Sequence, residues 1–310
     1  MAPPTPPIPA APTELTGLTG RGATGGLGEV GGLTVATALG EARVVGLDRL
    51  DAELLLCHVL SCRRTWVLAH GEAALDNATA TEWRGLAARR RTGEPLAYLV
   101  GEKEFHGLTL TVDRHVLVPR PDTELLVDRA LEILHLQAAG HARPRVVDLG
   151  TGSGAIALAV KAACAATRMC ASDDSHEALD VARANATRLA IEIEFRAGSW
   201  WTPWTGERFD LALANPPYVA VADPHLLALR DEPSSALVAG VDGLSALRAI
   251  VAGARGHLEP RGWLLLEHGC AQAGAVQELL HDAGFSAVET LRDLDGNPRC
   301  TGGKLGGVRE

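Results

Sequence analysis

The most specific chemical motif of the chain is Asn215-Pro216-Pro217-Tyr218, which follows an apolar stretch predicted to form a strand. Two successive prolines fix the backbone and carry no N–H donors, so the loop presents carbonyl acceptors and the Asn215 amide rigidly. Tyr218 adds a flat apolar face. We expect the Asn215 side-chain oxygen and the Pro216 carbonyl to accept hydrogen bonds from a planar, neutral –NH2 group. They would also stabilise the positive charge that develops on its nitrogen during attack.

A plain turn after a strand is the structural alternative for this loop, but such a turn requires only one proline. Two kinds of nitrogen match the chemistry equally well. One is the side-chain amide of a protein, and the other is the exocyclic amino group of adenine or guanine. The motif therefore predicts the reaction type and leaves the substrate open.

A glycine turn lies earlier in the chain, in Val146-Val147-Asp148-Leu149-Gly150-Thr151-Gly152-Ser153-Gly154. The pattern GxGxG stands between a predicted strand and a predicted helix, and glycine there lets the backbone approach a ligand closely. The dinucleotide fingerprint GxGxxG does not match, because residue 155 is Ala and the third glycine comes one position early. We expect residues 150–154 to bind a cofactor.

Two further positions sharpen the prediction of a nucleoside site. Asp173 ends the next predicted strand, where a carboxylate can accept both ribose hydroxyl protons. A helix cap is the alternative, which we assign to its neighbours Asp174 and Ser175. Trp200 and Trp201 follow the third strand at the same sheet edge. We assign an adenine contact to Trp200, because base–aromatic stacking is favourable, while core filling suits at least one of the pair.

The elements that must position these residues alternate between strand and helix from Arg145 onward. The expected strands cover 146–147, 169–173, 193–197, 209–214, 262–267, 286–292 and 300–306, and the helices cover 153–166, 175–189, 243–256 and 272–283. Such alternation indicates an α/β fold with a mostly parallel sheet that helices cover on both faces. The last two strands are expected to add an antiparallel edge.

The chain before this region divides into three segments. Residues 1–35 are rich in Pro and Gly, and we expect a disordered extension. Residues 36–95 show helical spacing, for which packing and gripping a partner are equally good explanations. Residues 96–120 are expected to form a hairpin linker. The catalytic domain would then span 121–310, opening with a helix that Asp122 caps.

Composition narrows the function classes. The 310 residues are 46% apolar and 22% charged, without an apolar run long enough to span a membrane or a recognisable secretion signal. The cytoplasm is therefore the expected compartment. The net charge of −9 weighs against a nucleic-acid substrate. The six cysteines have no metal-ligand spacing, and we expect reduced thiols and no metal site.

From about residue 45 to 305 the chain resembles the bacterial release factor glutamine methyltransferases, the HemK/PrmC family. The matching stretches are residues 93–99, Val118-Pro119-Arg120-Pro121-Asp122-Thr123-Glu124, the GTGSG turn, the NPPY loop and Glu267-His268-Gly269. Glu232-Pro233, Ala236-Leu237 and Arg292-Asp293 also match. We expect these last three pairs and the EHG stretch on the far side of the domain. The RPDTE and EHG stretches are more specific than NPPY, and they favour the release factor branch over the related ribosomal-protein glutamine methyltransferases.

The resemblance implies a class I methyltransferase with a seven-stranded Rossmann-like sheet and a small helical N-terminal domain. It implies methyl transfer from S-adenosyl-L-methionine to the glutamine of the GGQ motif in peptide chain release factors. By the family pattern, the cofactor-binding residues are Gly150, Thr151, Gly152, Ser153, Gly154, Asp173, Trp200 and Asn215. Asn215 to Tyr218 would hold the glutamine, and the helical domain would contact the release factor. The family often has Asp where this chain has Ser199.

Two rival hypotheses share much of this pattern. An N6-adenine or N2-guanine nucleic-acid methyltransferase would have the same fold, cofactor and loop, but it would bind its substrate with steep salt dependence. A cofactor-binding scaffold that has lost catalysis would keep the glycine turn, but the intact Asn215–Tyr218 loop argues against it.

Overall fold

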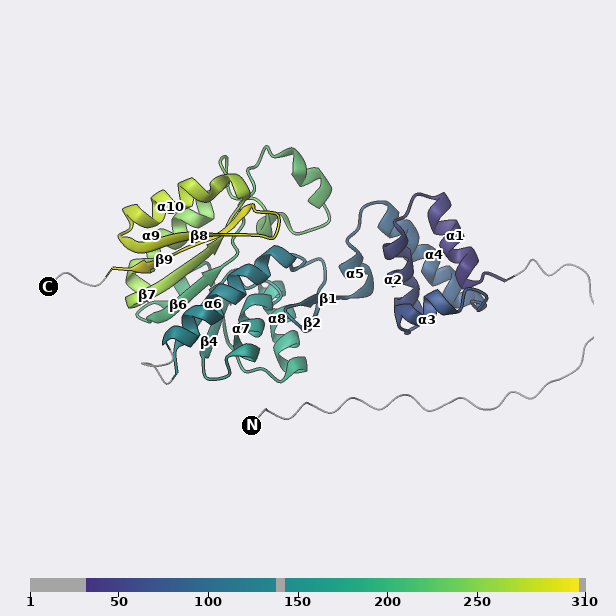
Figure 1. Cartoon of the computed structure of the whole chain (residues 1–310), viewed down its shortest axis with the longest axis horizontal. Helices are drawn as coiled ribbons and strands as arrows, with labels where there is room; N and C mark the ends of the chain where they lie inside the picture. The colour runs from purple at the N-terminus through teal and green to yellow at the C-terminus, as the bar shows by residue number, and fades with distance from the viewer. Residues whose placement is uncertain (1–31, 138–142, 307–310) are drawn as a thin grey trace, which may run out of the picture.

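The computed structural model describes residues 32–137 and 143–306 (Figure 1). A helical domain stands beside a larger sheet domain, and a short helix and a hairpin join them. The extension predicted for residues 1–35 lies outside the described residues, apart from residues 32–35. There, Thr34 caps the first helix by accepting from the backbone N–H of Thr37. None of the described helices is long and apolar enough to cross a membrane.

The helical domain has its own hydrophobic core. Its helices are α1 (Val35–Val44), α2 (Arg49–Val59), α3 (Arg64–Ala69), α4 (Asn77–Arg91) and α5 (Leu96–Val100). The side chains of Leu55, Leu56 and Trp83 are completely or almost completely buried in this core. The apolar residues that recur with helical spacing in α2 therefore form the face that packs into this core.

The linker differs from the expected hairpin over residues 96–120. Residues 96–100 form α5, because Pro95 precedes the helix with a fixed φ and Gly101 ends it in the left-handed region at φ 77°. The hairpin is shorter, with β1 (Glu102–Phe105) antiparallel to β2 (Leu108–Thr111). The following residues form no strand. Val112, Val116 and Val118 pack with Ala97 onto Ala178 and Val181, a group that we call the linker cluster.

Within the described residues the sheet contains seven strands, as the alternation predicts. They are β3 (Arg145–Leu149), β4 (Arg168–Asp173), β5 (Glu194–Ala197), β6 (Phe209–Ala214), β7 (Leu258–Glu267), β8 (Phe285–Arg292) and β9 (Pro298–Leu305). Their spatial order is β5-β4-β3-β6-β7-β9-β8. All pairings are parallel except those of β9, which runs antiparallel to β7 and to β8. The predicted mostly parallel sheet with an antiparallel edge is confirmed.

Helices cover both faces of the sheet (Figure 1). α6 (Glu124–Gln137), α7 (Ala155–Ala163) and α8 (His176–Leu189) lie on the face to which Val146 points. α9 (Ser245–His257) and α10 (Ala273–Asp282) lie on the opposite face, with Val147 and Leu149. Successive residues of a strand point to opposite faces of the sheet, and helices bury both faces. The strands are therefore apolar at consecutive positions in the sequence.

The strand order reverses at β3. The chain passes from β3 outward to β4 and β5, and then returns to add β6 on the other side. At such a reversal the loops after neighbouring strands separate and leave a crevice at the carboxyl edge of the sheet. The glycine turn follows β3, Asp173 ends β4, and Asn215 follows β6, so the fold brings all three to this crevice.

Candidate active site

A cavity of about 140 Å³ occupies the carboxyl edge of the sheet. Of the residues predicted to form the site, Gly150, Thr151, Gly152, Ser153, Asp173, Trp200, Asn215 and Pro217 line this cavity. Gly154, Pro216 and Tyr218 do not. The structure therefore brings most of the predicted residues together, although they come from loops after different strands.

The glycine turn is shaped by backbone conformations that favour glycine. Gly150 has φ 76°, and a Cβ on it would lie 3.1 Å from Cζ3 of Trp200, so glycine allows the ring to approach the turn. Gly154 has φ 83° and caps α7. A Cβ there would lie 3.1 Å from Leu158 and 3.3 Å from Ala182. Gly154 therefore serves close packing and the start of the helix rather than lining the cavity.

A buried carboxyl supports the turn from below. Asp148 is completely buried, and its Oδ2 accepts a hydrogen bond of 2.6 Å from the Thr151 hydroxyl. Its other oxygen has no partner among the described residues. Burial raises the pKa of Asp148 to about 7 because the charged form loses its hydration. Asp148 is not among the predicted site residues, although an acid inside an apolar strand before a glycine turn is a usable signal.

Asp173 holds the turn from the end of β4. One carboxylate oxygen accepts from the backbone N–H of Gly152 at 2.8 Å, and the other accepts from that of Ser175 at 3.0 Å. Burial raises the pKa of this carboxyl. The helix cap falls to Ser175, whose hydroxyl accepts from the N–H of Ala178. Each carboxylate oxygen can accept more than one hydrogen bond, so Asp173 keeps acceptor capacity at the cavity.

The two tryptophans have separate positions. Trp200 has φ 46°, and its ring lies against the glycine turn at the cavity wall. Trp201 is buried on the other side, where its Nε1 donates to the Ile250 carbonyl at 2.8 Å. Its ring stacks on His257 with centroids 4.9 Å apart. Trp201 thus fills the core, which agrees with the expectation for one of the pair.

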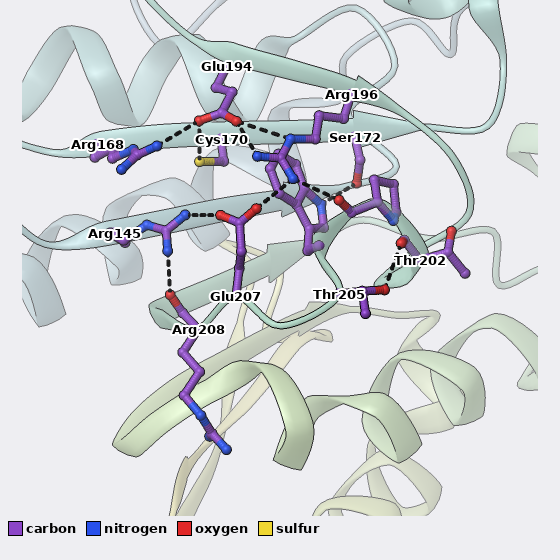
Figure 2. A network of polar contacts seen from close by, with 12 residues as sticks. Arg145, Arg168, Cys170, Ser172, Glu194, Arg196, Thr202, Thr205, Glu207 and Arg208 are labelled. Carbon is purple, nitrogen blue, oxygen red and sulfur yellow. Dashed lines mark hydrogen bonds and ion pairs between the residues drawn. The ribbon is translucent and has the colours of Figure 1, made fainter.

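A network of arginines and carboxylates holds the segment that follows Trp200 (Figure 2). Arg196 donates to the Pro203 carbonyl at 2.8 Å and to Glu207, and its guanidinium lies 4.3 Å from the Trp204 ring centroid. Arg145 also pairs with Glu207. Trp204 is buried and donates through Nε1 to the Ser172 hydroxyl. These contacts fix the backbone that places Trp200.

The Asn215–Tyr218 loop is held by side chains from three other elements. Asn215 Nδ2 donates to the Thr123 hydroxyl at 3.1 Å. The Tyr218 carbonyl accepts from Gln272 Nε2 at 3.0 Å. The Tyr218 hydroxyl makes a long contact of 3.5 Å to Glu267 Oε1. Hydrogen bonds therefore hold the loop at both of its ends, at Asn215 and at Tyr218.

The RPDTE stretch connects the parts of the site. The Arg120 guanidinium pairs with the buried Glu232, which also accepts from the backbone N–H of Val118. Asp122 lies 3.2 Å from Arg299 on β9. Thr123 contacts Asn215, and Glu124 accepts from the backbone N–H of His106 at 3.0 Å. Each of these side chains thus ties the site to a different segment.

These contacts correct two expectations. Asp122 is not the cap of a helix, because Pro121–Thr123 form a 3-10 turn and α6 begins at Glu124. Its carboxylate faces Arg299 instead. Glu232 and Glu267 do not lie on the far side of the domain, since Glu232 pairs with Arg120 and Glu267 lies beside Tyr218. The Arg292-Asp293 pair is also linked to the site, because Asp293 binds Arg299 at 2.8 Å.

The surroundings of the loop favour uncharged groups. Glu267 is almost completely buried, and burial raises its pKa to about 7. Burial also raises the pKa of Tyr218, so the phenol keeps its proton. His268 is buried between the Gly269 carbonyl and the Thr301 hydroxyl, and burial lowers its pKa. The imidazole is therefore neutral at pH 7.

One wall of the cavity is formed by residues that are not among the predicted site residues. His115, Val116, Leu117 and Pro119 of the linker and Pro233, Ser235 and Ala236 of the loop before α9 also line it. Ser199, where the family often has Asp, lines it too. Pro119, Pro233 and Ala236 belong to the matching stretches, which are the available signal. Pro233 and Ala236 therefore lie at the site and not on the far side of the domain. The pairing between Arg120 and Glu232, however, has no local sequence pattern.

Comparisons with known proteins agree with this geometry. Residues 33–101 match the family model of the PrmC N-terminal domain, and residues 124–230 match that of the methyltransferase small domain. The catalytic domain of hMettl16, solved in complex with MAT2A 3′UTR hairpin 1, has a similar fold. It gives a TM-score of 0.51 at 15% identity and covers 74% of this chain and 81% of that one.

Proteins of known family are similar over most of the chain. Release factor glutamine methyltransferases from Xylella fastidiosa (strain Temecula1) and Pseudomonas aeruginosa are 47% and 46% identical, each aligned over 87% of this chain and 98% of their own length. That of Bordetella pertussis is 48% identical over 84% of this chain and 96% of its own. With both domains and the site accounted for, this chain belongs to the family of release factor glutamine methyltransferases.

Proposed function

We propose that this protein transfers a methyl group from S-adenosyl-L-methionine to the side-chain amide nitrogen of the glutamine in the GGQ motif of peptide chain release factors. One structural observation supports the proposal most directly. Asn215 and Pro217 of the NPPY loop line the same cavity as the glycine turn, Asp173 and Trp200. A methyl donor held at the turn and an –NH2 group held at the loop would therefore meet in a single cavity.

The residues at the carboxyl edge fit this cofactor. Asp173 offers carboxylate acceptors for ribose hydroxyls, Gly150 to Ser153 offer backbone close to the cavity, and the Trp200 ring offers a stacking face for adenine. When bound, the cofactor supplies an electrophilic methyl group on a sulfonium. We assign cofactor binding to these residues and to Asn215. Gly154 has no part in the assignment, because it packs against Leu158 and Ala182.

The loop residues would hold the substrate glutamine. We assign the acceptor roles to the Asn215 side-chain oxygen and the Pro216 carbonyl and the flat support to the Tyr218 ring, although of these three residues only Asn215 lines the cavity. An acceptor that is held in place stabilises positive charge on the nitrogen without rearranging. Holding the nitrogen about 3–3.5 Å from the methyl carbon gives a near-attack geometry. No base is needed before attack, since the proton leaves late.

The remaining partner assignments follow from family membership and composition. Release factors are the protein substrate, and the helical domain α1–α5 contacts them beside the cavity. The net charge of −9 disfavours nucleic acid as the substrate. The reaction belongs to translation termination in the cytoplasm.

The test is methyl transfer from labelled S-adenosylmethionine to purified release factor. A release factor with Gln→Ala in its GGQ motif, a ribosomal-protein glutamine substrate, bulk RNA and bulk DNA are assayed in parallel. Label on the intact release factor alone supports the proposal. Label on nucleic acid would support the amino-base methyltransferase instead, and label on ribosomal protein would support the related glutamine branch. If none of them is labelled, the result would support the hypothesis of a cofactor-binding scaffold that has lost catalysis.

A further inference from the structure

The side chain of Gln272 lies where three loops of the sheet domain meet. It ends the 3-10 turn Cys270–Gln272, which leads from β7 into α10. Its Nε2 donates to the Tyr218 carbonyl at 3.0 Å and to the Gly243 carbonyl at 3.2 Å. Its Oε1 accepts from the backbone N–H of Gly269 at 2.9 Å. One amide therefore joins the end of the NPPY loop, the segment before α9 and the EHG stretch.

These contacts fix the orientation of the Gln272 amide. Its NH2 group has two hydrogens, and the two carbonyl oxygens within 3.2 Å can accept both of them. A third carbonyl, that of Asp242, lies 3.5 Å away. The reversed amide would place its oxygen against these carbonyls and its NH2 group against the N–H of Gly269. Only the observed orientation satisfies both polar atoms of the side chain.

The backbone segments around Gln272 approach its amide closely. Gly243 has φ 73°, and a Cβ on it would lie 2.3 Å from the Tyr218 oxygen and 2.7 Å from Gln272 Nε2. A Cβ on Gly269 would lie 3.1 Å from Gln272 Oε1. Glycine at both positions leaves room for the backbone to reach the amide directly. The Gln272 side chain therefore occupies a place that the surrounding backbone is shaped to hold.

The NPPY loop needs support at its ends because its two prolines have no N–H groups. Neither proline can be held by a hydrogen bond that its own backbone donates. At the first end of the loop, Asn215 Nδ2 donates to the Thr123 hydroxyl. At the second end, the Tyr218 carbonyl accepts from Gln272. Pro217, next to Tyr218, lines the cavity, whereas Gln272 does not.

We infer that Gln272 is a positioning residue for methyl transfer, which fixes the Tyr218 end of the NPPY loop and thereby the place of Pro217 at the cavity. The inference rests on the proposed function, because the loop has to hold the substrate –NH2 group in line with the methyl donor. The effect of Gln272 passes through the backbone of the loop. A displacement of about 1 Å in such a site can lower a rate by about 100-fold.

The first test is Gln272→Met, which removes the amide and keeps an unbranched side chain of similar length. The Tyr218 and Gly243 carbonyls then lose their donor, and the end of the loop can shift. With labelled S-adenosylmethionine and release factor, we expect kcat to fall roughly 10- to 100-fold. KM for the release factor and the affinity for the cofactor should change less than about threefold, because the protein surface, Asp173 and the glycine turn are unchanged.

A second variant separates the donor from the volume of the side chain. Gln272→Glu keeps the shape and an acceptor for the N–H of Gly269, but it places an oxygen opposite the other carbonyls. The assay is run at pH 8.5, well above the ordinary glutamate pKa of about 4.3, because an ionised carboxylate cannot donate. We expect kcat to fall at least as far as in Gln272→Met. A kcat within about threefold of the parent would show that volume alone matters, and it would overturn the inference.

Gln277 provides a matched control. It lies on α10, where its Nε2 donates to the Thr290 hydroxyl at 2.8 Å, and it does not line the cavity. Both glutamines are half-buried. Gln277→Met removes a hydrogen bond of the same kind and should leave kcat within about twofold of the parent. Thermal unfolding of every variant shows that folded proteins are being compared.

An Asn215→Ala background tests whether Gln272 acts through the loop. There the loop no longer offers the Asn215 acceptor, so its placement matters less. In single-turnover reactions, Gln272→Met should then lower the rate less than about threefold relative to Asn215→Ala alone. An equal fold-change in both backgrounds, a parent-like kcat in Gln272→Met or an equal loss in Gln277→Met would overturn the inference. Failure of the proposed function is distinguishable, because the parent protein would then not label the release factor at all.

Discussion

The end of the cavity at Asp173 is built from backbone groups of neighbouring strand ends, whereas the end at Asn215 depends on side chains from distant segments. In the first, which we call the cofactor half, Asp173 binds the N–H groups of Gly152 and Ser175. In the second, the substrate half, Asn215 and Tyr218 are held by Thr123, Glu267 and Gln272. The first half is thus fixed by the sheet, and the second by the tertiary structure around it.

Both halves nevertheless place a buried carboxyl beside a side-chain hydroxyl. Asp148 accepts from the Thr151 hydroxyl beside the glycine turn, and Glu267 lies 3.5 Å from the Tyr218 hydroxyl behind the loop. Burial raises the pKa of each carboxyl to about 7. A buried carboxyl therefore supports the glycine turn in one half and lies beside the aromatic side chain of the loop in the other. Substitutions in the two halves should have different kinetic signatures, with cofactor affinity affected in one and turnover in the other.

The largest effect is expected from Asn215→Ala in the substrate half. Removing the acceptor for the substrate –NH2 should lower turnover by about a thousandfold or more. Much of the cofactor affinity should remain, because Asp173 and the glycine turn are intact. Single-turnover methylation and calorimetric titration of the cofactor measure the two effects. Asn77→Ala, at the exposed start of α4, is the control. Unchanged turnover in Asn215→Ala would disprove the proposed role of the loop.

The second prediction concerns the pH dependence of stability and uses Glu267→Gln. The folded protein keeps the Glu267 proton up to about pH 7, whereas the ordinary pKa of this carboxyl is 4.5. Between these values the unfolded chain has released the proton and the folded chain has not. The contribution of Glu267 to stability is therefore fully present below pH 4.5, and it declines as pH rises toward 7.

Glu267→Gln removes this decline, so its unfolding free energy relative to the parent should increase from pH 4.5 to 7. A shift of this size corresponds to an increase of roughly 3 kcal/mol. Urea unfolding at several pH values measures it. Asp148 is unchanged in both proteins and contributes equally to each. A difference between variant and parent that is constant over this range would contradict the raised pKa of Glu267.

A third substitution, Asp173→Asn, addresses the cofactor half. It replaces one acceptor oxygen by a donor that opposes either the Gly152 or the Ser175 N–H group. Hydrogen bonds to charged groups contribute about 1.5–3 kcal/mol, so cofactor affinity should fall roughly 10- to 100-fold. At saturating cofactor, turnover should stay within about threefold. Asp180→Asn, exposed on α8, is the matched control. A large loss of turnover with normal affinity would show that the two halves do not divide as described.

The smallest effect is expected from Ser199→Asp, which introduces the residue that the family often has. Ser199 is exposed and lines the cavity. A carboxylate accepts hydrogen bonds more strongly than a hydroxyl, so cofactor affinity should rise about 3- to 10-fold. Ser199→Asn provides an uncharged comparison. Titration with the cofactor decides the question, and weaker binding by Ser199→Asp would rule out an adenine contact at this position.

The comparison of the two halves also explains what the sequence could predict. The sheet, its antiparallel pair and the positions of Gly150, Asp173 and Asn215 follow from periodicity and from the ends of strands, which are local signals. Thr123, Glu267 and Gln272 meet the loop only through tertiary contacts, and no spacing along the chain indicates them. The helix cap predicted for Asp122 is wrong for the same reason, because its partner, Arg299, lies on the last strand.

The linker cluster has a consequence for biosynthesis. The core of the helical domain is complete within residues 33–100, so this domain can close as soon as it leaves the ribosome. Val112, Val116 and Val118 emerge next, but their packing partners Ala178 and Val181 belong to α8 and are translated later. These valines therefore remain without α8 as a packing partner in the nascent chain until β3, α7, β4 and α8 have been made. The wall that the linker contributes to the cavity is thus set only after the first two strands of the sheet have been synthesised.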